Sequence, residues 1–228
     1  MKKTLLLLAA LVVVALPVSA LANSFTFRAP VTAANQGSGG PNQFDLDHHN
    51  AYTWRIDNIS IPAGQVITGA TLTFTNMQNW DANANMLFVH MFDTATHAGV
   101  FTFADPSGAT GVPVTNIFDD FGVTSPGGVG AGVGNTFLGS SSFSNTTAST
   151  WTITFNQQQL NALAAYIANG NNIAFGFDPD CHFWNNGITF SFTTAPTGVP
   201  EPMTLTLLGT GLTGLYLRRR RQKSVARN

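Results

Sequence analysis

Two short acidic segments contain the densest sets of side chains that could bind a metal ion. Residues 45–49 read Asp-Leu-Asp-His-His, and residues 178–182 read Asp-Pro-Asp-Cys-His. Alternate residues of an extended chain point to the same side, so each segment presents two carboxylates together. Such oxygen ligands suit calcium, which would also offset the repulsion between the carboxylates. The sequence therefore predicts a Ca²⁺ site, the only expected cofactor, formed by Asp45, Asp47, Asp178 and Asp180.

Two other interpretations of these segments stay open. Aspartates often accept hydrogen bonds from the backbone two residues on, so all four could simply stabilise turns. His48, His49 and His182 could instead join the aspartates around zinc, whose catalytic sites have three protein ligands and an open position. The order Asp-x-Asp-His-His matches no hydrolase motif, so the sequence favours calcium over zinc.

The segment around Trp80 is a candidate ligand-binding surface. Residues 76–85 are rich in asparagine and aspartate, which suggests a polar loop. An aromatic ring presents an amphipathic surface on which the apolar face of a sugar can stack, while acidic and amide groups bind its hydroxyls. We therefore predict Trp80 and Asp81 as ligand-binding residues. Trp54 and Trp151 alternate with polar residues and are expected in the core.

No motif in the sequence indicates catalysis. Residues 24–198 contain no glutamate, so a glycosidase would have to use two aspartates as its acid and base. No Gly-x-Ser-x-Gly nucleophile motif is present. Cys181 is the single cysteine, which excludes an intramolecular disulfide, and its aromatic neighbours predict that it is buried. We expect that the protein is not an enzyme.

Apolar and small polar residues alternate along much of the chain, which predicts β-strands. Strands are expected around these segments: residues 52–61, 71–75, 86–93, 151–155, 173–177 and 188–192. Asn156 is expected to cap one helix over residues 157–168, whose buried stripe would hold Leu160, Leu163, Ala164 and Ile167. Residues 122–145 are rich in Gly and Ser and suggest a long loop.

These elements predict an all-β fold, a jelly-roll-like β-sandwich with one short helix. Residues 67–74 resemble a strand common in carbohydrate-binding jelly-roll modules. We expect this domain to be flanked by an N-terminal signal helix and a C-terminal membrane helix.

Charge is segregated along the sequence. Of the 228 residues, 10 are Lys or Arg, and all but Arg28 and Arg55 lie near the two ends. Between residues 24 and 198, two arginines stand against ten aspartates, a net charge of −8. A domain with this charge repels a phosphate backbone, so we expect no nucleic-acid partner.

Residues 1–22 have the three parts of a secretory signal peptide. Lys2 and Lys3 form a positive start, residues 4–16 are apolar, and Ala20-Leu21-Ala22 is a small-x-small cleavage pattern. The apolar part is too short to span a bilayer comfortably. The sequence therefore predicts export of the chain.

The last thirty residues also have three parts in a fixed order. Val199-Pro200-Glu201-Pro202 precedes an apolar run over residues 203–217, and four basic residues follow, Arg218, Arg219, Arg220 and Arg221. Fifteen helical residues span about 22 Å, short of the roughly 30 Å hydrocarbon core, which suits a temporary anchor. The arginines would act as a stop-transfer signal that stays cytoplasmic.

This tail resembles the PEP-CTERM sorting signal, which some classifications call an "ice-binding protein C-terminal" motif. The resemblance implies a Gram-negative bacterium, transient anchoring in the inner membrane, and an exosortase as the processing partner. That membrane cysteine transpeptidase would cleave near Pro200-Glu201-Pro202 and release the protein to the cell surface or extracellular matrix. The family occurs in bacteria that make exopolysaccharide, which is therefore a second expected partner.

The expected organisation is a signal peptide (1–22), a β-sandwich passenger domain that resembles an uncharacterised family (23–198), and a sorting tail (199–228). The expected function is structural or adhesive, at the surface or in the matrix, in association with exopolysaccharide. Two alternatives are a carbohydrate-binding module, which an exposed aromatic surface near Trp80 would favour, and a polysaccharide-modifying enzyme, which a cleft with converging Asp and His would favour.

Overall fold

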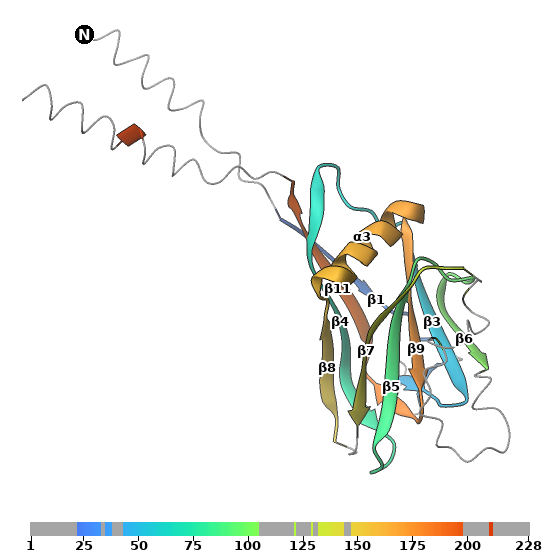
Figure 1. The fold of residues 1–228 in the computed structure, drawn as a ribbon. Coiled ribbons are helices and arrows are strands. Elements are labelled where there is room, and N and C mark those ends of the chain that lie inside the picture. Colours follow the sequence, from blue (N-terminus) through green and yellow to red (C-terminus); the bar gives the residue numbers. More distant parts are fainter. Residues whose placement is uncertain are drawn as a thin grey trace, which may run out of the picture. The chain divides into compact units, whose positions relative to one another are not determined.

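In a computed structural model of the chain, the segments with alternating apolar and polar residues form a sandwich of two β-sheets (Figure 1). The structure describes residues 22–32, 35–37, 43–104, 121, 129, 132–143, 147–197 and 210–211. The sandwich belongs to the unit Ala22–Ala195. The predicted signal helix, the sorting residues 199–202 and Arg218–Arg221 lie outside the described residues.

The first sheet has six strands. Five of them follow the order β1-β11-β4-β10-β2, and β8 also pairs with β4. Their bounds are β1 Asn23–Arg28, β2 Phe44–Leu46, β4 Gln65–Asn79, β8 Ser149–Thr154, β10 Phe183–Asn185 and β11 Ile188–Pro196.

The second sheet has five antiparallel strands in the order β6-β3-β9-β5-β7. Their bounds are β3 Asn50–Asp57, β5 Asn85–Phe92, β6 Gly99–Ala104, β7 Asn135–Phe143 and β9 Asn172–Pro179. The all-β sandwich with one short helix is therefore confirmed for the described part of the chain.

The predicted alternation decides which side chains fill the sandwich. Leu72 and Phe74 of β4 are buried between the sheets, as are Phe190 and Phe192 of β11. Hydroxyl side chains cover the opposite face of the first sheet and pair across strands, with Thr73 Oγ1 3.1 Å from Thr152 Oγ1 and Thr26 Oγ1 3.0 Å from Ser191 Oγ. One face of this sheet is thus core and the other is polar, as expected for an antiparallel sandwich.

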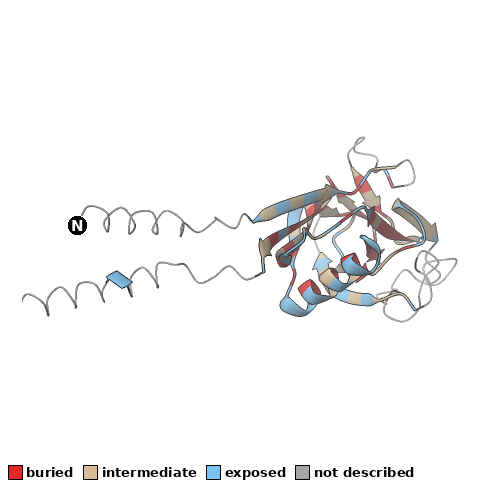
Figure 2. Ribbon diagram, turned by 90° about the horizontal axis from the view of Figure 1, so that it is seen from above, coloured by how far each residue is buried: buried red, intermediate tan, exposed pale blue. Residues whose placement is uncertain are grey.

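The helix α3, Gln157–Gly170, begins as the sequence predicts and ends two residues later than expected, and Ala164 of the predicted stripe is only partly buried. The Asn156 side chain accepts a hydrogen bond from the Gln159 backbone at 2.9 Å, and the Gln159 side chain reaches back to the Asn156 N–H. Leu160, Leu163 and Ile167 are buried, while the opposite face is exposed (Figure 2). Because α3 contacts β4, β7 and β9, it covers one end of the sandwich and joins both sheets.

Two boundary expectations are wrong. The predicted strand over residues 52–61 ends at Asp57, because Asn58 adopts a left-handed conformation with φ of 57°. The Gly/Ser-rich stretch 122–145 is not a loop throughout, since Asn135–Phe143 forms β7 and pairs with β5. Its register shifts beside Gly139, whose φ of 149° marks a bulge. The Gly and Ser residues of β7 have weak strand propensity, and pairing with β5 compensates for it.

The second sheet is covered on both faces. Its inner face joins the main core, and its outer face carries a smaller apolar cluster that includes Ala174, Phe92 and Phe121. A Cβ placed on Gly176 of β9 would lie 2.6 Å from Phe92 Cε2 and 2.9 Å from Phe121 Cε2. The small residues at alternate positions of β9 are therefore needed for aromatic rings to lie flat on this sheet.

Among the described residues, no helix has both the length and the apolar character needed to cross a membrane.

Candidate metal centre and ligand-binding surface

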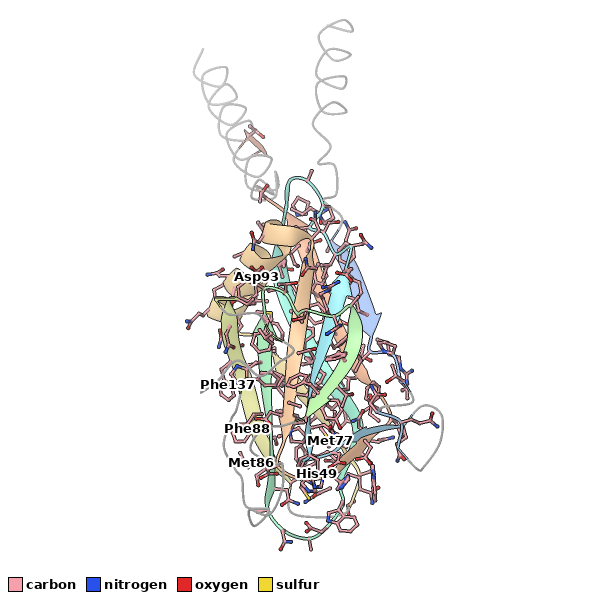
Figure 3. The ribbon with its side chains drawn as sticks, turned by 90° about the vertical axis from the view of Figure 1, so that its right-hand side faces the viewer. His49, Met77, Met86, Phe88, Asp93 and Phe137 are labelled. Carbon is pink, nitrogen blue, oxygen red and sulfur yellow. The ribbon has the colours of Figure 1, made fainter. Side chains whose placement is uncertain are left out.

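Strand pairing brings the two acidic segments of the sequence together. β10 pairs antiparallel with β2, which places Trp184 opposite Asp45. The turn after β2 and the segment before β10 consequently lie side by side, although Asp45 and His182 are 137 residues apart. Figure 3 shows His49 toward the end of the sandwich that is opposite Asp93 and α3. Strand pairing thus places His182 beside Asp45 and Asp47.

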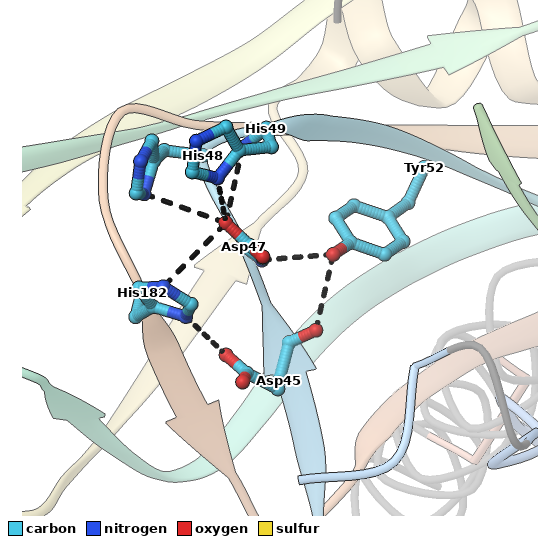
Figure 4. A network of polar contacts seen from close by, with 6 residues as sticks. All are labelled: Asp45, Asp47, His48, His49, Tyr52 and His182. Carbon is cyan, nitrogen blue, oxygen red and sulfur yellow. Dashed lines mark hydrogen bonds and ion pairs between the residues drawn. The ribbon is translucent and has the colours of Figure 1, made fainter. Parts of the chain in front are cut away.

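One carboxylate oxygen, Asp47 Oδ1, is the centre of the resulting cluster (Figure 4). It lies 3.0 Å from His49 Nδ1, 3.4 Å from His48 Nδ1 and 3.5 Å from His182 Nε2. It also accepts the backbone N–H of His49 at 3.1 Å, the geometry of an Asx turn. Asp47 thus stabilises a turn and gathers three imidazole rings around one oxygen.

A second carboxylate and a buried tyrosine hold this cluster in place. His182 Nδ1 lies 3.0 Å from Asp45 Oδ1, so the other ring nitrogen is directed at Asp47. The Asp47 backbone N–H donates to Tyr52 Oη at 2.8 Å, and Tyr52 donates to the Asp45 carbonyl at 3.2 Å. Because Tyr52 is fully buried in β3, it ties the turn to the rigid second sheet.

The charges of the cluster shift the pKa values of its members. The hydrogen bond to Asp45 raises the pKa of His182, against partial burial, and the charges of Asp45 and Asp47 add to this effect. Partial burial by itself would raise the pKa of Asp47, but hydrogen bonds from His49 and the charges of His182 and His48 together hold it below its usual value. The site thus favours an ionised carboxylate beside imidazoles.

The other two predicted calcium ligands lie in β9 and directly after it. Asp178 is buried within β9, opposite Phe88 of β5. Asp180 accepts the Met86 N–H at 2.5 Å, and its own N–H donates to the Met86 carbonyl at 3.0 Å. Burial raises the pKa of Asp180 to about 6. Asp45 and Asp47 therefore meet histidines, whereas Asp178 and Asp180 are engaged with β5 and β9; calcium binding stays a prediction.

Trp80 projects from the chain just after β4, near the same cluster. Its side chain is 55% exposed, and its ring centroid lies 5.8 Å from that of His182. The Trp80 N–H donates to the His182 carbonyl at 3.0 Å, which fixes the backbone on which the indole is presented. An exposed indole on a fixed backbone is suited to contact a ligand.

Asp81 is held within a network of asparagines. It accepts hydrogen bonds from the backbone and side chain of Asn83, at 2.9 and 2.6 Å, and from Asn85 Nδ2 at 2.9 Å. Asn85 Nδ2 also donates to the buried Asn79, which donates in turn to the Phe143 carbonyl at 2.7 Å. These bonds hold the pKa of Asp81 below its usual value, although desolvation opposes them. These hydrogen bonds tie the turn that carries Trp80 to β5 and β7.

Trp54, Trp151 and Cys181 were also singled out in the sequence, and all three are wholly or partly buried. Trp54 is buried as predicted, whereas Trp151 is only partly buried and stacks on Phe74 with ring centroids 5.2 Å apart. Cys181 is a buried free thiol, and burial raises its pKa to about 11, as expected for an inert cysteine. Tyr52 was not predicted as part of the site, although it contacts both Asp45 and Asp47. Its position in a predicted strand close to Asp47 was the feature of the sequence that could have indicated this role.

Comparison with known proteins identifies the tail. Residues 198–221 match the PEP-CTERM protein-sorting motif. No curated protein matches the chain. The motif marks an exported protein that passes through a membrane-anchored intermediate and is sorted by an exosortase. The predicted sorting tail is confirmed, and the motif leaves the role of the sandwich open.

Proposed function

We propose that this protein is a structural or adhesive component of the cell surface or extracellular matrix of a Gram-negative bacterium. The end of the sandwich that carries Trp80 contacts exopolysaccharide. The exposure of the Trp80 indole carries this proposal, because most aromatic residues of the two sheets fill the core and, among the described residues, Phe137 of β7 is the other strongly exposed one, at 49%.

The surroundings of Trp80 support a sugar ligand. The indole offers an apolar face, while Asp81, Asn83 and His182 place carboxylate, amide and imidazole groups around it. Sugars combine apolar C–H faces with hydroxyl groups, so a rigid aromatic ring beside polar groups matches their chemistry. Surface sorting by the tail would deliver this end of the domain to exopolysaccharide.

A dedicated carbohydrate-binding module is the second candidate, and the strand order favours it. Eight strands follow the orders β1-β11-β4-β8 and β3-β9-β5-β7. This arrangement supports the predicted jelly roll, a fold used by many lectin domains. A polysaccharide-modifying enzyme is less well supported, since both ring nitrogens of His182 already contact carboxylates rather than a nucleophile. We therefore propose a binding role without catalysis.

Affinity electrophoresis tests this function. The full chain, purified in mild detergent, is run through gels that contain the extracellular polysaccharide of the bacterium that produces it. We expect retardation of the protein and at least a tenfold loss of affinity in Trp80→Ala, the usual scale for a Trp at the centre of an interface. Val66→Ala is the matched control, because Val66 is also a large exposed apolar residue, at 46%. Equal retardation of Trp80→Ala and the native protein would refute the proposed surface.

A further inference from the structure

The geometry points to a structural metal site of the zinc class, formed by Asp47, His48, His49 and His182 at the end of the sandwich. These residues offer one carboxylate oxygen and three imidazole nitrogens. The site would clamp the turn after β2 to the segment before β10. This inference concerns the stability of the domain and does not depend on polysaccharide binding.

The spacing of the ligand atoms suits a zinc ion. Zinc lies 2.0–2.2 Å from imidazole nitrogen and carboxylate oxygen, so neighbouring ligand atoms of a tetrahedral site are about 3.3–3.6 Å apart. Asp47 Oδ1 lies 3.0, 3.4 and 3.5 Å from His49 Nδ1, His48 Nδ1 and His182 Nε2, respectively. The ligand atoms of Asp47, His48 and His49 all lie within 4.8 Å of one another. His182 lies outside this group of three, and its Nε2, 3.5 Å from Asp47 Oδ1, would have to move with its ring to share the ion.

His182 has the kind of partner that a metal-bound histidine usually has. A metal-bound histidine usually donates its other ring N–H to a carboxylate, which fixes the tautomer and the ring orientation. Asp45 Oδ1 lies 3.0 Å from His182 Nδ1 and leaves Nε2 directed at the cluster. Asp45 is in turn tied to β3 through Tyr52. His182 therefore already has the carboxylate partner that orients a metal-bound histidine, and Tyr52 holds that partner in place.

The charge of the cluster also favours a divalent cation. In the part of the chain that the structure describes, every ion pair of Asp45 and Asp47 is with a histidine. Arg55 instead contacts Asp57 and the Ala95 carbonyl, and Arg28 contacts the Asn186 carbonyl. A divalent cation would stabilise this cluster in two ways. It would accept the lone pairs of the imidazole nitrogens, and it would offset the negative charge of the two carboxylates.

The donor set selects the class of ion. Calcium takes six to eight oxygen ligands, whereas imidazole suits zinc and its first-row neighbours. Four protein ligands leave no open position, which is the pattern of a structural rather than a catalytic site. His182 is 137 residues from Asp45, so the ion would close a long loop in a chain that has a single cysteine.

The test uses the full chain in mild detergent, without a polyhistidine tag, stripped of metal and then titrated with Zn²⁺ or Ca²⁺. We expect one Zn²⁺ per chain by equilibrium dialysis and a rise in melting temperature of about 5–10 °C at a hundredfold excess over Kd. Co²⁺ should give the intense visible absorption of a tetrahedral nitrogen and oxygen site. A weak octahedral spectrum, or stabilisation by Ca²⁺ without Zn²⁺ binding, would overturn the proposal.

Variants assign the site to its residues. His182→Ala and His49→Ala should each weaken Zn²⁺ binding at least a hundredfold, and Asp45→Asn about 10–100-fold. His97→Ala is the matched control, because His97 is exposed and stacks on Phe101, with ring centroids 3.7 Å apart. Unchanged Zn²⁺ affinity in both His182→Ala and His49→Ala would refute the assignment. If these variants fail to fold, the Co²⁺ spectrum of the native chain still decides the outcome.

Discussion

Replacing Gly176 by alanine adds one methyl group and tests how closely aromatic side chains pack on the outer face of the second sheet. It lies in β9, between Thr53 of β3 and His90 of β5. An alanine Cβ there would lie 2.6 Å from Phe92 Cε2 and 2.9 Å from Phe121 Cε2, well inside normal contact distance. Both rings are buried, and paired strands on either side prevent β9 from moving away.

The expected cost follows from this overlap. Forcing an extra methyl into a packed site costs about 1–3 kcal/mol, whereas replacing Gly by Ala in a strand returns roughly 0.5–1 kcal/mol of backbone entropy. We therefore expect Gly176→Ala to lower the free energy of unfolding by about 1–2 kcal/mol. For a domain of this size, the melting temperature should fall by about 2–8 °C.

Gly69→Ala provides the matched control for this substitution. Gly69 also lies inside a strand, β4, but its nearest neighbour would be the exposed Thr193 hydroxyl at 3.3 Å, which can shift. Because the backbone entropy term is then not outweighed by an overlap, Gly69→Ala should not lower the free energy of unfolding and should raise it by at most about 1 kcal/mol. Urea titrations followed by tryptophan fluorescence measure both variants.

Relief of the overlap gives a further check. Adding Phe121→Leu to Gly176→Ala should cost less than the sum of the two single changes, because the smaller side chain makes room for the methyl group. Equal stability of Gly176→Ala and Gly69→Ala, or strict additivity with Phe121→Leu, would show that Phe121 does not lie on this face.

Two other substitutions probe local contacts. Asn156→Ala removes the cap of α3 and should lower the free energy of unfolding by about 0.5–2 kcal/mol, measured by thermal melting; Gln157→Ala, exposed in the first turn, is the control, and an equal effect would contradict the capping role. Tyr52→Phe removes the hydroxyl that bonds the Asp47 N–H and the Asp45 carbonyl, so urea unfolding should show a loss of about 1–3 kcal/mol; a loss below 0.5 kcal/mol would mean that the turn does not depend on Tyr52.

Much of the fold could be predicted because local pattern and burial agree. Alternation in β4, β9 and β11 identified strands and their inward faces, since a half-buried strand must place every second residue in the core. The helix was found from Asn156 and the stripe that begins at Leu160, because capping and the 3.6-residue period are local properties. β7 was missed, because its stability comes from pairing with β5 rather than from its own composition.

The candidate site was only half predictable. The sequence marked Asp47 and His182 as unusual and suggested that their segments meet, which the pairing of β10 with β2 confirms. It could not tell which carboxylates would share one cluster. The segment that contains Asp178 and Asp180 resembles the segment around Asp45 in composition. In the structure, however, Asp178 pairs with Phe88 of β5, and the Asp180 side chain accepts the N–H of Met86 in the same strand.

The sequence by itself determined that this protein is exported and sorted, because the sorting motif is recognised as a sequence pattern in residues 198–221. It also determined the β class, through a period that each strand carries locally. Only the tertiary structure decided that three imidazoles surround Asp47 Oδ1 and that the Trp80 indole is exposed beside them. Those placements depend on register between strands more than a hundred residues apart, and a one-residue slip would turn each side chain to the other face.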